Sequence, residues 1–314
     1  MLNFRDLRYF VAVAESGSIL AASERLHVAQ PSISVRIRTI ESDLGVALFE
    51  RRPRGVVLTE EGEELLVHAR LILNSEETAR ESLRRHAASP VGTVTFGVPT
   101  SLASVLSVPL IEAALKKLPN VRLRIIESMT GYIIEWLRSG RLDLGLVFVD
   151  NPISGVQTEK LLSEDLHVAA GTAADLEPLL TSRGEVPMEK LAGVPLVLPT
   201  ERHGLRSLID HHLRRHGVSS RVTFEIDAFL QIQRLVQRGH GMTILSLAAL
   251  HDGLLKPPLA TARIVRPTIE RTVSLAHADD RPLTKAAREV ARLAASQLRA
   301  EAAESWWHAR ATGS

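Results

Sequence analysis

The stretch from residue 17 to residue 34 constrains the fold of this chain more than any other part of it. It opens on Gly17-Ser18, a pair that suits the end of one helix and the cap of the next. It continues through a short turn, residues 27–29, to Gln30-Pro31, where proline fits the first turn of a helix because that position needs no N–H donor. The pattern predicts two short helices joined by a tight turn, and Gly45 ends the second one.

The second of these helices has an apolar face and a polar face. Ile33, Ile37, Ile40 and Leu44 repeat at helical spacing and predict a buried stripe. The outward face carries Gln30, Pro31, Ser32, Ser34, Val35, Arg36 and Arg38. Small polar groups and guanidinium groups on the exposed front of a helix can reach base edges in the major groove of DNA. The outward residues are therefore candidates for DNA binding.

A short apolar segment, a Pro/Gly turn and a second apolar segment follow at residues 46–58. This pattern predicts a small β-hairpin, and a three-helix unit with such a hairpin is a winged helix-turn-helix. Near the tip lie Arg51, Arg52 and Arg54, which suit phosphates or the minor groove. The alternative is that any helical hairpin shows this spacing and that the arginines form a solvated loop. The net charge of +2, from 38 basic and 36 acidic side chains, gives little support, so the hypothesis depends on local placement.

Many markers of one protein family occur across residues 17–62. They are Gly17-Ser18, Ala22, Leu26, Gln30-Pro31, Ser34, Glu41, Leu44-Gly45, Leu48-Phe49, Arg51, Arg54-Gly55, Leu58-Thr59 and Gly62. In these positions the segment resembles the N-terminal domain of LysR-type transcriptional regulators, and most of all the branch that contains the nitrogen assimilation control protein. The departures are Ser23 for the usual alanine, Ile33 for leucine and Arg36 for glutamine, of which Arg36 can change which bases are read. The resemblance implies a regulator of transcription that binds double-stranded DNA.

A helix of about residues 60–86 follows, and Thr59 can cap its start. Its apolar residues form a narrow seam: Leu65, Ala69, Ile72, Ala79 and Leu83. This helix either packs on its own domain or dimerises, and the family resemblance implies dimerisation within a homodimer or homotetramer. Residues 87–90 break the helix, so we expect a DNA-binding domain at residues 1–58 and a linker helix at residues 59–90.

From residue 91 onward, apolar strands alternate with amphipathic helices, which predicts an α/β fold with a mostly parallel, doubly wound sheet. Residues 95–102 and 197–204 both run from a strand through Pro-Thr into a helix start. Two similar halves predict a clamshell, and helix N-termini attract anions. A carboxylate or sulfate would be bound in this cleft by Thr100, Ser101, Thr200 and Arg202, with His203 as a further candidate. The alternative is that the Ser and Thr side chains merely cap helices.

Residues 91–300 also resemble the effector-binding domain of the same family, a periplasmic-binding-protein-like fold. The markers are residues 140–145 and 238–245, although Ser246 replaces the proline that usually follows. The resemblance implies further cleft residues: Ser128, Thr130, Phe148, Asp227 and Ser246. We expect subdomain I at about residues 91–163 and 266–300, and subdomain II at about residues 164–265. For the tail, residues 301–314 with Trp306-Trp307, packing on the domain, a partner contact and a frayed end all remain open.

Several function classes find no support in the sequence. The chain contains no cysteine, which excludes disulfides and thiol chemistry. No catalytic elbow, metalloprotease helix or phosphate-binding loop occurs, and a solvated helix face explains His211, His212 and His216 better than a metal does. We therefore predict no enzyme activity, no cofactor and no metal site. No apolar run is long enough for a membrane span and the N-terminus lacks a signal-peptide layout, which favours a cytoplasmic protein.

These observations favour a DNA-binding transcription regulator whose activity responds to a small, anionic effector between two α/β subdomains. The effector would change DNA bending or contact with RNA polymerase by favouring one subdomain arrangement. The alternative hypothesis is a cytoplasmic small-molecule-binding protein or enzyme whose N-terminal helices only dimerise.

Overall fold

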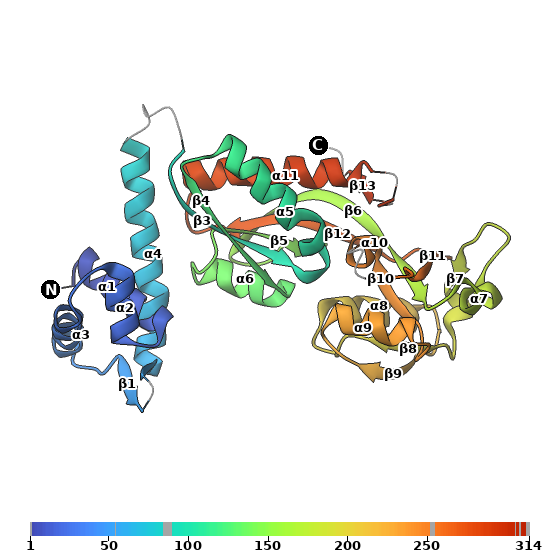
Figure 1. Cartoon of the computed structure of the whole chain (residues 1–314), viewed down its shortest axis with the longest axis horizontal. Helices are drawn as coiled ribbons and strands as arrows, with labels where there is room; N and C mark the ends of the chain where they lie inside the picture. The colour runs from blue at the N-terminus through green and yellow to red at the C-terminus, as the bar shows by residue number, and fades with distance from the viewer. Residues whose placement is uncertain are drawn as a thin grey trace. The chain divides into compact units, whose positions relative to one another are not determined.

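The computed structural model describes residues 2–53, 55–83, 90–251, 255–304, 306–307 and 309–311. Between residues 83 and 90 the chain passes from an N-terminal to a C-terminal compact unit (Figure 1). Within the described ranges, no helix is long and apolar enough to cross a membrane. The described residues also bring together no group of three or more His, Asp or Glu side chains that could hold a metal ion.

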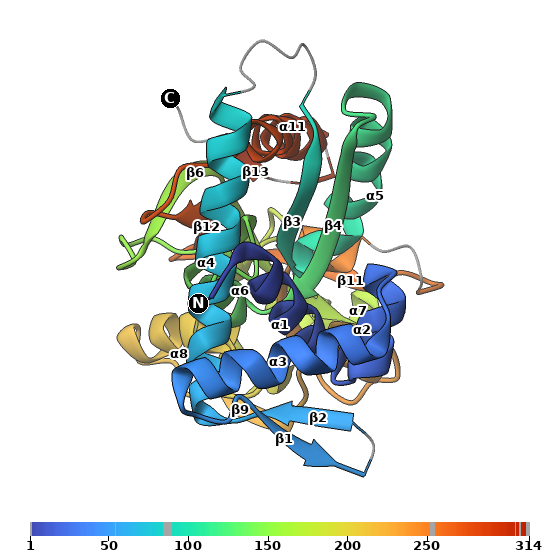
Figure 2. The same ribbon diagram turned by 90° about the vertical axis from the view of Figure 1, so that its left-hand side faces the viewer.

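The N-terminal unit is a winged helix-turn-helix followed by a long helix. Its elements are α1 (Phe4–Ser16), α2 (Ile19–Leu26), α3 (Gln30–Leu44), β1 (Phe49–Arg52), β2 (Gly55–Leu58) and α4 (Glu60–Leu83). The helix ends follow the predicted signals, because Ser18 Oγ accepts a hydrogen bond from Ala21 N, and Gly17 and Gly45 adopt the left-handed conformation. Figure 2 shows the β1–β2 hairpin running beside α3. The predicted continuation of α4 beyond residue 83 and the break at residues 87–89 lie outside the described residues.

One face of α3 packs against a small apolar core that it shares with α1. Phe10 and Val13 of α1 and Ile33 of α3 are fully buried, and Ile37 and Ile40 continue the stripe. The sequence also placed Leu44 in this stripe, but the structure leaves its side chain 47% exposed. Leu44 is the last residue of α3, and Leu48, after the turn at Gly45, is the buried leucine of this core instead.

The hairpin is tied to the helices by backbone contacts. Val56 N donates a hydrogen bond to Gly17 O at 2.8 Å. A Cβ atom on Gly55 would lie 2.2 Å from that oxygen, and the φ of Gly55 is 140°, so no larger residue fits this close approach. Just before and at the start of β1, Glu41 Oε1 of α3 accepts hydrogen bonds from Leu48 N at 2.9 Å and from Phe49 N at 3.3 Å. The angle of the hairpin against α3 is therefore fixed at both ends.

The C-terminal unit contains two α/β halves that share one sheet. The first half has β3 (Gly92–Pro99), α5 (Thr100–Lys117), β4 (Val121–Ser128), α6 (Thr130–Arg138) and β5 (Leu144–Phe148). The second half has β6 (Val156–Ala170), α7 (Ala173–Leu176), β7 (Val186–Pro187), β8 (Pro195–Leu198), α8 (Gly204–Arg215), β9 (Arg221–Glu225), α9 (Phe229–Gln237), β10 (Thr243–Ser246), α10 (Leu247–Leu250) and β11 (Ala260–Val265). The chain then continues through β12 (Glu270–Ala278), α11 (Lys285–Ala302) and β13 (Ala309–Ala311).

The large sheet is mixed, whereas the sequence predicted a mostly parallel one. β3 pairs in parallel with β4 and β5, but β12 is antiparallel to both β5 and β6. The sequence predicted only the apolar end of β6, residues 166–170, as a strand. The preceding residues 156–165 are rich in polar side chains and gave no strand signal, but they pair antiparallel with β12. β6 and β12 therefore run together from one half of the unit to the other (Figure 1).

Each half has its own hydrophobic core. Along β6, Leu162 belongs to the core of the first half and Leu166 to that of the second. On the return, Ile269 belongs to the second core and Val273 of β12 to the first. The two crossings between the halves therefore lie side by side, on paired strands.

The C-terminal tail packs back on its own domain, which answers one of the alternatives left open by the sequence. Trp307 is 1% exposed, and β13 pairs antiparallel with β6. Arg310 forms ion pairs with Asp165 and Glu270, both at 2.7 Å. These contacts attach the tail to the strands that link the two halves.

Candidate DNA interface and effector cleft

The outward face of α3 is open to solvent. Ser34 is half-buried, and the other predicted DNA-contacting residues of this helix are exposed: Gln30, Pro31, Ser32, Val35, Arg36 and Arg38. No side chain caps the start of α3, because the N-cap position is Ala29. Pro31 has no N–H group and Ser32 N already donates to Ala29 O, so the exposed side chains of α3 are what this face offers to a polyanionic partner.

Arg36, the position that departs from the family pattern, lies beside a buried carboxylate that the sequence analysis did not find. Arg36 Nε lies 3.7 Å from Oδ1 of Asp6, whose side chain is 4% exposed, while that of Arg36 is 45% exposed. This distance is too long for a hydrogen bond, and Asp6 Oδ1 has no hydrogen-bond partner among the described residues. Asp6 therefore attracts the Nε side of the Arg36 guanidinium group and leaves the Nη1 and Nη2 groups to solvent.

The wing arginines do not share one surface. Arg51 and Arg52 are neighbours on β1, and successive side chains of a strand point to opposite faces. Arg52 Nη2 lies 2.7 Å from Glu50 Oε2, with both side chains exposed. Only one face of the hairpin can meet a duplex, so Arg51 and Arg52 cannot make equivalent contacts. The predicted contact of Arg54 lies outside the described residues.

The start of α5 has the features predicted for an anion site. Thr100 is the first residue of the helix, and its N-cap residue, Pro99, offers no side-chain cap. Thr100 is half-buried, whereas Ser101 is only 3% exposed. The N–H groups and the Thr100 hydroxyl group at this helix end are thus the accessible hydrogen-bond donors.

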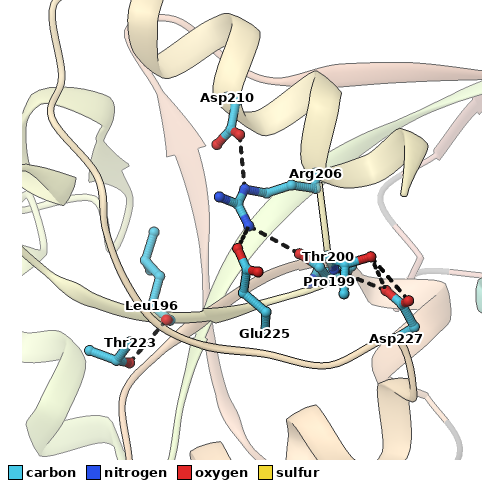
Figure 3. A network of polar contacts seen from close by, with 8 residues as sticks. All are labelled: Leu196, Pro199, Thr200, Arg206, Asp210, Thr223, Glu225 and Asp227. Carbon is cyan, nitrogen blue, oxygen red and sulfur yellow. Dashed lines mark hydrogen bonds and ion pairs between the residues drawn. The ribbon is translucent and has the colours of Figure 1, made fainter. Parts of the chain in front are cut away.

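The second predicted helix start has a different geometry. The helix begins at Gly204, close to the predicted start at Leu205, and His203 caps it by accepting a hydrogen bond from Leu205 N at 3.1 Å. Thr200 donates to Asp227 from both N and Oγ1, at 2.9 and 3.0 Å (Figure 3). Two predicted cleft residues are therefore paired with one another, and the Thr200 hydroxyl proton is already in use.

Arg206 holds this loop in place, and the sequence analysis did not find it. Its Nε donates to Asp210 at 2.9 Å, and its Nη1 donates to Glu225 at 2.7 Å and to Pro199 O at 3.1 Å (Figure 3). Burial alone would lower the pKa of Arg206, but the bonds to Glu225 and Asp210 outweigh burial and raise it. Arg206 thus fixes the backbone that presents Thr200.

Three other predicted residues meet around a buried guanidinium group, in what we call the Arg271 cluster (Arg271, Glu164, Ser101, Ser246, Phe148 and Trp307). Arg271 Nη2 donates to Ser101 Oγ at 3.0 Å and to Ser246 Oγ at 2.8 Å. Its Nε donates to Glu164 Oε1 at 2.7 Å, and its Cζ lies 3.7 Å from the centre of the Phe148 ring. Glu164 Oε2 accepts a hydrogen bond from Trp307 Nε1 at 2.8 Å.

The Arg271 cluster joins the two halves of the C-terminal unit. Ser101 belongs to α5 of the first half, and Ser246 ends β10 of the second. Arg271 and Glu164 lie opposite one another on the crossing strands β12 and β6. Since Ser246 is 0% exposed and Ser101 3%, the cluster is a buried junction rather than an open binding surface.

The charges of both Asp227, the partner of Thr200, and Arg271 of the cluster act on His203. Burial lowers its pKa below the ordinary value of 6.5, Asp227 opposes this shift, and the positive charge of Arg271 adds to it. A neutral ring is consistent with its cap, because Nδ1 accepts from a backbone N–H group.

The remaining predicted residues lie at the ends of first-half elements or on the loop before α8. Ser128 ends β4 and Thr130 begins α6. Thr130 Oγ1 accepts a hydrogen bond from Phe148 N at 3.3 Å and so keeps its own proton to donate. Arg202 is exposed. The accessible donors are therefore Thr100, Ser128, Thr130 and Arg202, whereas Ser101, Ser246 and Thr200 are engaged within the protein.

Two family models cover nearly the whole chain. Residues 4–63 match the model described as "Bacterial regulatory helix-turn-helix protein, lysR family", and residues 87–299 match the model "LysR substrate binding domain". The nitrogen assimilation regulatory protein nac of Escherichia coli (strain K12) is 28% identical over 293 residues, which are 92% of this chain and 94% of that protein. The HTH-type transcriptional regulator TfdS of Cupriavidus pinatubonensis is 32% identical over 299 residues, or 93% and 98% of the two chains.

Solved structures agree with this fold. Full-length OxyR from Pseudomonas aeruginosa, in a variant form, superposes with a TM-score of 0.79 at 23% identity, covering 100% of this chain and 99% of that one. CbnR in complex with its target DNA superposes with a TM-score of 0.65 at 23% identity, covering 96% and 100%. At this identity the structural likeness shows the fold, and the family models show the kind of protein.

Proposed function

The chain belongs to the LysR family of bacterial regulators, and we propose that the exposed face of α3 reads its operator while a small anion at the start of α5 controls it. As a LysR-type protein it is a transcription regulator with a DNA-binding helix-turn-helix and an effector-binding domain. It is not an enzyme, so the alternative of an enzyme with dimerising N-terminal helices does not hold.

The proposal for α3 depends on one observation: its polar outward face is exposed while the opposite face forms the core. Ser32, Ser34, Val35 and Arg36 would contact base edges in the major groove, with Gln30, Pro31 and Arg38 at the margins. Because Asp6 holds the base of Arg36, the guanidinium group is oriented before DNA arrives. Arg51 or Arg52 of the wing, and Arg54, would contact phosphates or the minor groove.

A gel-shift assay against the DNA upstream of the chain's own gene tests this reading role. Arg36→Ala should cost about 1–3 kcal/mol of specific affinity and relax the preference for operator over random DNA. Arg38→Ala should weaken binding to both DNAs alike if it contacts phosphate. Arg214→Ala, an exposed residue of α8, is the matched control and should change neither. Equal operator affinity for Arg36→Ala and the unmodified protein would reject the proposal.

For the effector, the donors at the start of α5 carry the proposal. Thr100, with Ser128, Thr130 and Arg202, would bind a carboxylate, sulfate or similar anion, and the helix N-terminus adds positive potential. Asp227 opposes an anion near Thr200, so Thr200, Ser101, Phe148, Asp227 and Ser246 would shape the cleft rather than donate to the ligand.

A thermal-shift screen of small anions, followed by calorimetry of the best one, tests the effector proposal. A ligand that binds only the folded state raises the melting temperature. Thr100→Val should weaken its binding about threefold to tenfold, the effect of one lost hydrogen bond, and leave operator binding without effector unchanged. Arg36→Ala, on α3, provides the reverse control, because it should weaken operator binding and leave the anion affinity unchanged. Equal anion affinity for Thr100→Val would remove Thr100 from the site.

Assembly through α4 completes the proposal. Ile72 of the predicted seam is 41% exposed, which suits a second copy of the helix. We expect a homodimer or homotetramer that spaces two DNA readers, acts in the cytoplasm where its DNA is, and contacts RNA polymerase according to its effector state. The proposed domains are residues 1–58, 59–90, 91–300 and the tail, with subdomains that change near residues 164 and 265. Light scattering of Ile72→Glu should report a smaller species than the unmodified protein.

A further inference from the structure

A cavity of about 220 Å³ in the C-terminal unit is lined by residues that pack against the cores of both halves, such as Leu247 for the first half and Leu250 for the second. Four leucine side chains line it: Leu247, Leu250, Leu255 and Leu259. Trp306 of the tail closes one side, and Gln233 of α9 lies at its base. The cavity therefore requires both the second half and the tail, since elements far apart in the sequence line it.

One polar group in this apolar cavity has no internal partner. Gln233 is 2% exposed, and its Nε2 donates to Ala249 O at 2.8 Å, which fixes the orientation of the amide. Among the described residues, nothing donates a hydrogen bond to its Oε1. Buried side-chain acceptors are normally satisfied, so a molecule in the cavity gains stability by donating a hydrogen bond to this oxygen.

The aromatic wall favours a flat ring as the rest of the molecule. His251 stacks on Trp306 at 3.7 Å between ring centres, and Trp307 stacks on Trp306 at 5.6 Å. His251 and Trp306 both line the cavity, so this stack forms its aromatic wall. Ring edges carry partial positive charge and pack well against the face of another aromatic ring.

The volume sets the size. An engineered apolar cavity of about 150 Å³ binds benzene, so 220 Å³ suits a single ring with about two additional heavy atoms. A carboxylate is excluded as the buried group, because an anion and the Gln233 oxygen would repel one another.

We propose that this cavity is a second ligand site, for an uncharged single-ring aromatic molecule that donates a hydrogen bond to Gln233 Oε1, such as a phenol. The site borders α10, and Ala248 O of α10 accepts a hydrogen bond from Ser104 Oγ of α5 at 3.2 Å. A ligand that shifts α10 therefore acts on the helix whose start lies in the proposed effector cleft.

The test uses p-cresol as the probe and p-xylene, which has the same shape but no O–H group, as its matched partner. The full chain is labelled with 5-fluorotryptophan, which gives three fluorine resonances because the chain has three tryptophans. Trp306→Phe identifies the resonance of Trp306. Trp136, which stacks on Tyr132 of α6, provides an internal control in the same spectrum.

We expect p-cresol to shift the Trp306 resonance saturably and to bind about threefold to tenfold more tightly than p-xylene. Gln233→Leu should abolish this preference, and Leu250→Phe, which fills the cavity from its half-buried rim, should weaken both probes. The absence of a saturable shift at millimolar p-cresol overturns the proposal. So does equal affinity for the two probes, or a shift that persists unchanged in Leu250→Phe. The Leu250→Phe arm decides the matter even if Gln233→Leu does not fold.

Discussion

Breaking the ion pair of the Arg271 cluster should be one of the most damaging single changes to the C-terminal unit. Arg271 is 5% exposed and Glu164 1%, so neither charge has water to replace its partner. Arg271→Met leaves Glu164 charged and buried and removes the donor that serves Ser101 and Ser246. Losing one partner of a buried pair costs about 3–5 kcal/mol, which lowers the melting temperature of a domain of this size by about 10 °C.

The matched double variant separates the charge effect from packing. Arg271→Met combined with Glu164→Gln removes both charges and keeps an acceptor for Trp307 Nε1. The remaining cost is the two serine hydroxyl groups without their donor, about 1–2 kcal/mol. The double variant should therefore be more stable than Arg271→Met alone, which is the signature of coupled residues.

Intrinsic tryptophan fluorescence is the appropriate assay, because Trp136, Trp306 and Trp307 all belong to the C-terminal unit. Arg292→Met is the control: its pair with Glu289 has a 2.6 Å contact, but the Arg292 side chain is 74% exposed, so the loss should stay below about 1 kcal/mol. If Arg271→Met costs no more than Arg292→Met, or if the double variant is no more stable than Arg271→Met alone, the reasoning from burial is refuted.

Three further predictions follow from single contacts. Burial lowers the pKa of His203, so as the pH falls through the ordinary value of 6.5 the unfolded chain takes up a proton that the folded chain does not, and the free energy of unfolding decreases. His203→Asn, which keeps an acceptor for the helix cap, should therefore flatten the pH dependence of the fluorescence melting temperature between pH 7.5 and 5.5. An unchanged slope would contradict the assignment. Gly55→Ala should destabilise the N-terminal unit by at least about 2 kcal/mol and reduce operator binding, seen by gel shift, because its Cβ meets Gly17 O at 2.2 Å; full binding would show that the hairpin can move. Ser246→Ala should speed hydrogen exchange in β10 and α10, because it removes the hydrogen bond from Arg271. Ser274→Ala is the control, because Ser274 Oγ is buried with no hydrogen-bond partner among the described residues. Equal exchange rates in both variants would remove Ser246 from the junction.

The N-terminal unit could be predicted closely because its determinants are local. Helix caps, a proline in the first turn and an apolar period act over a few residues, and they identified α2, α3 and the hairpin. Leu44 shows the limit of the period rule, since it fits the apolar stripe and yet lies where the helix ends. Asp6 was missed for a related reason: a buried acid on α1 has no local signal, and only the fold brings it to Arg36.

The cleft was harder to predict because its partners are distant in the sequence. The Pro-Thr repeat placed Thr200 just before a helix, but it gave no sign that Thr200 binds Asp227, which lies 27 residues away. Ser101 was predicted to bind the effector at a helix start, whereas its hydroxyl group accepts a hydrogen bond from Arg271, which lies 170 residues further along the chain. No spacing rule links such pairs. Only the pairing of β6 with β12 brings Arg271 to Glu164.

The placement of the Arg271 cluster constrains how any effector can act. Since Arg271 Nη2 bonds Ser101 of one half and Ser246 of the other, a change in the angle between the halves lengthens at least one of these bonds. A hydrogen bond to a charged group contributes about 1.5–3 kcal/mol, whereas a nearly complete shift between two states needs about 5.5 kcal/mol of differential binding. The hydrogen bonds of the Arg271 cluster are therefore strong enough to fix the angle between the halves without effector. They are also weak enough for the binding energy of a tight effector to break them. A purely apolar junction would allow many angles between the halves, because apolar contacts are not directional. The buried guanidinium group of Arg271 instead favours the angles at which its hydrogen bonds to both serine residues are kept.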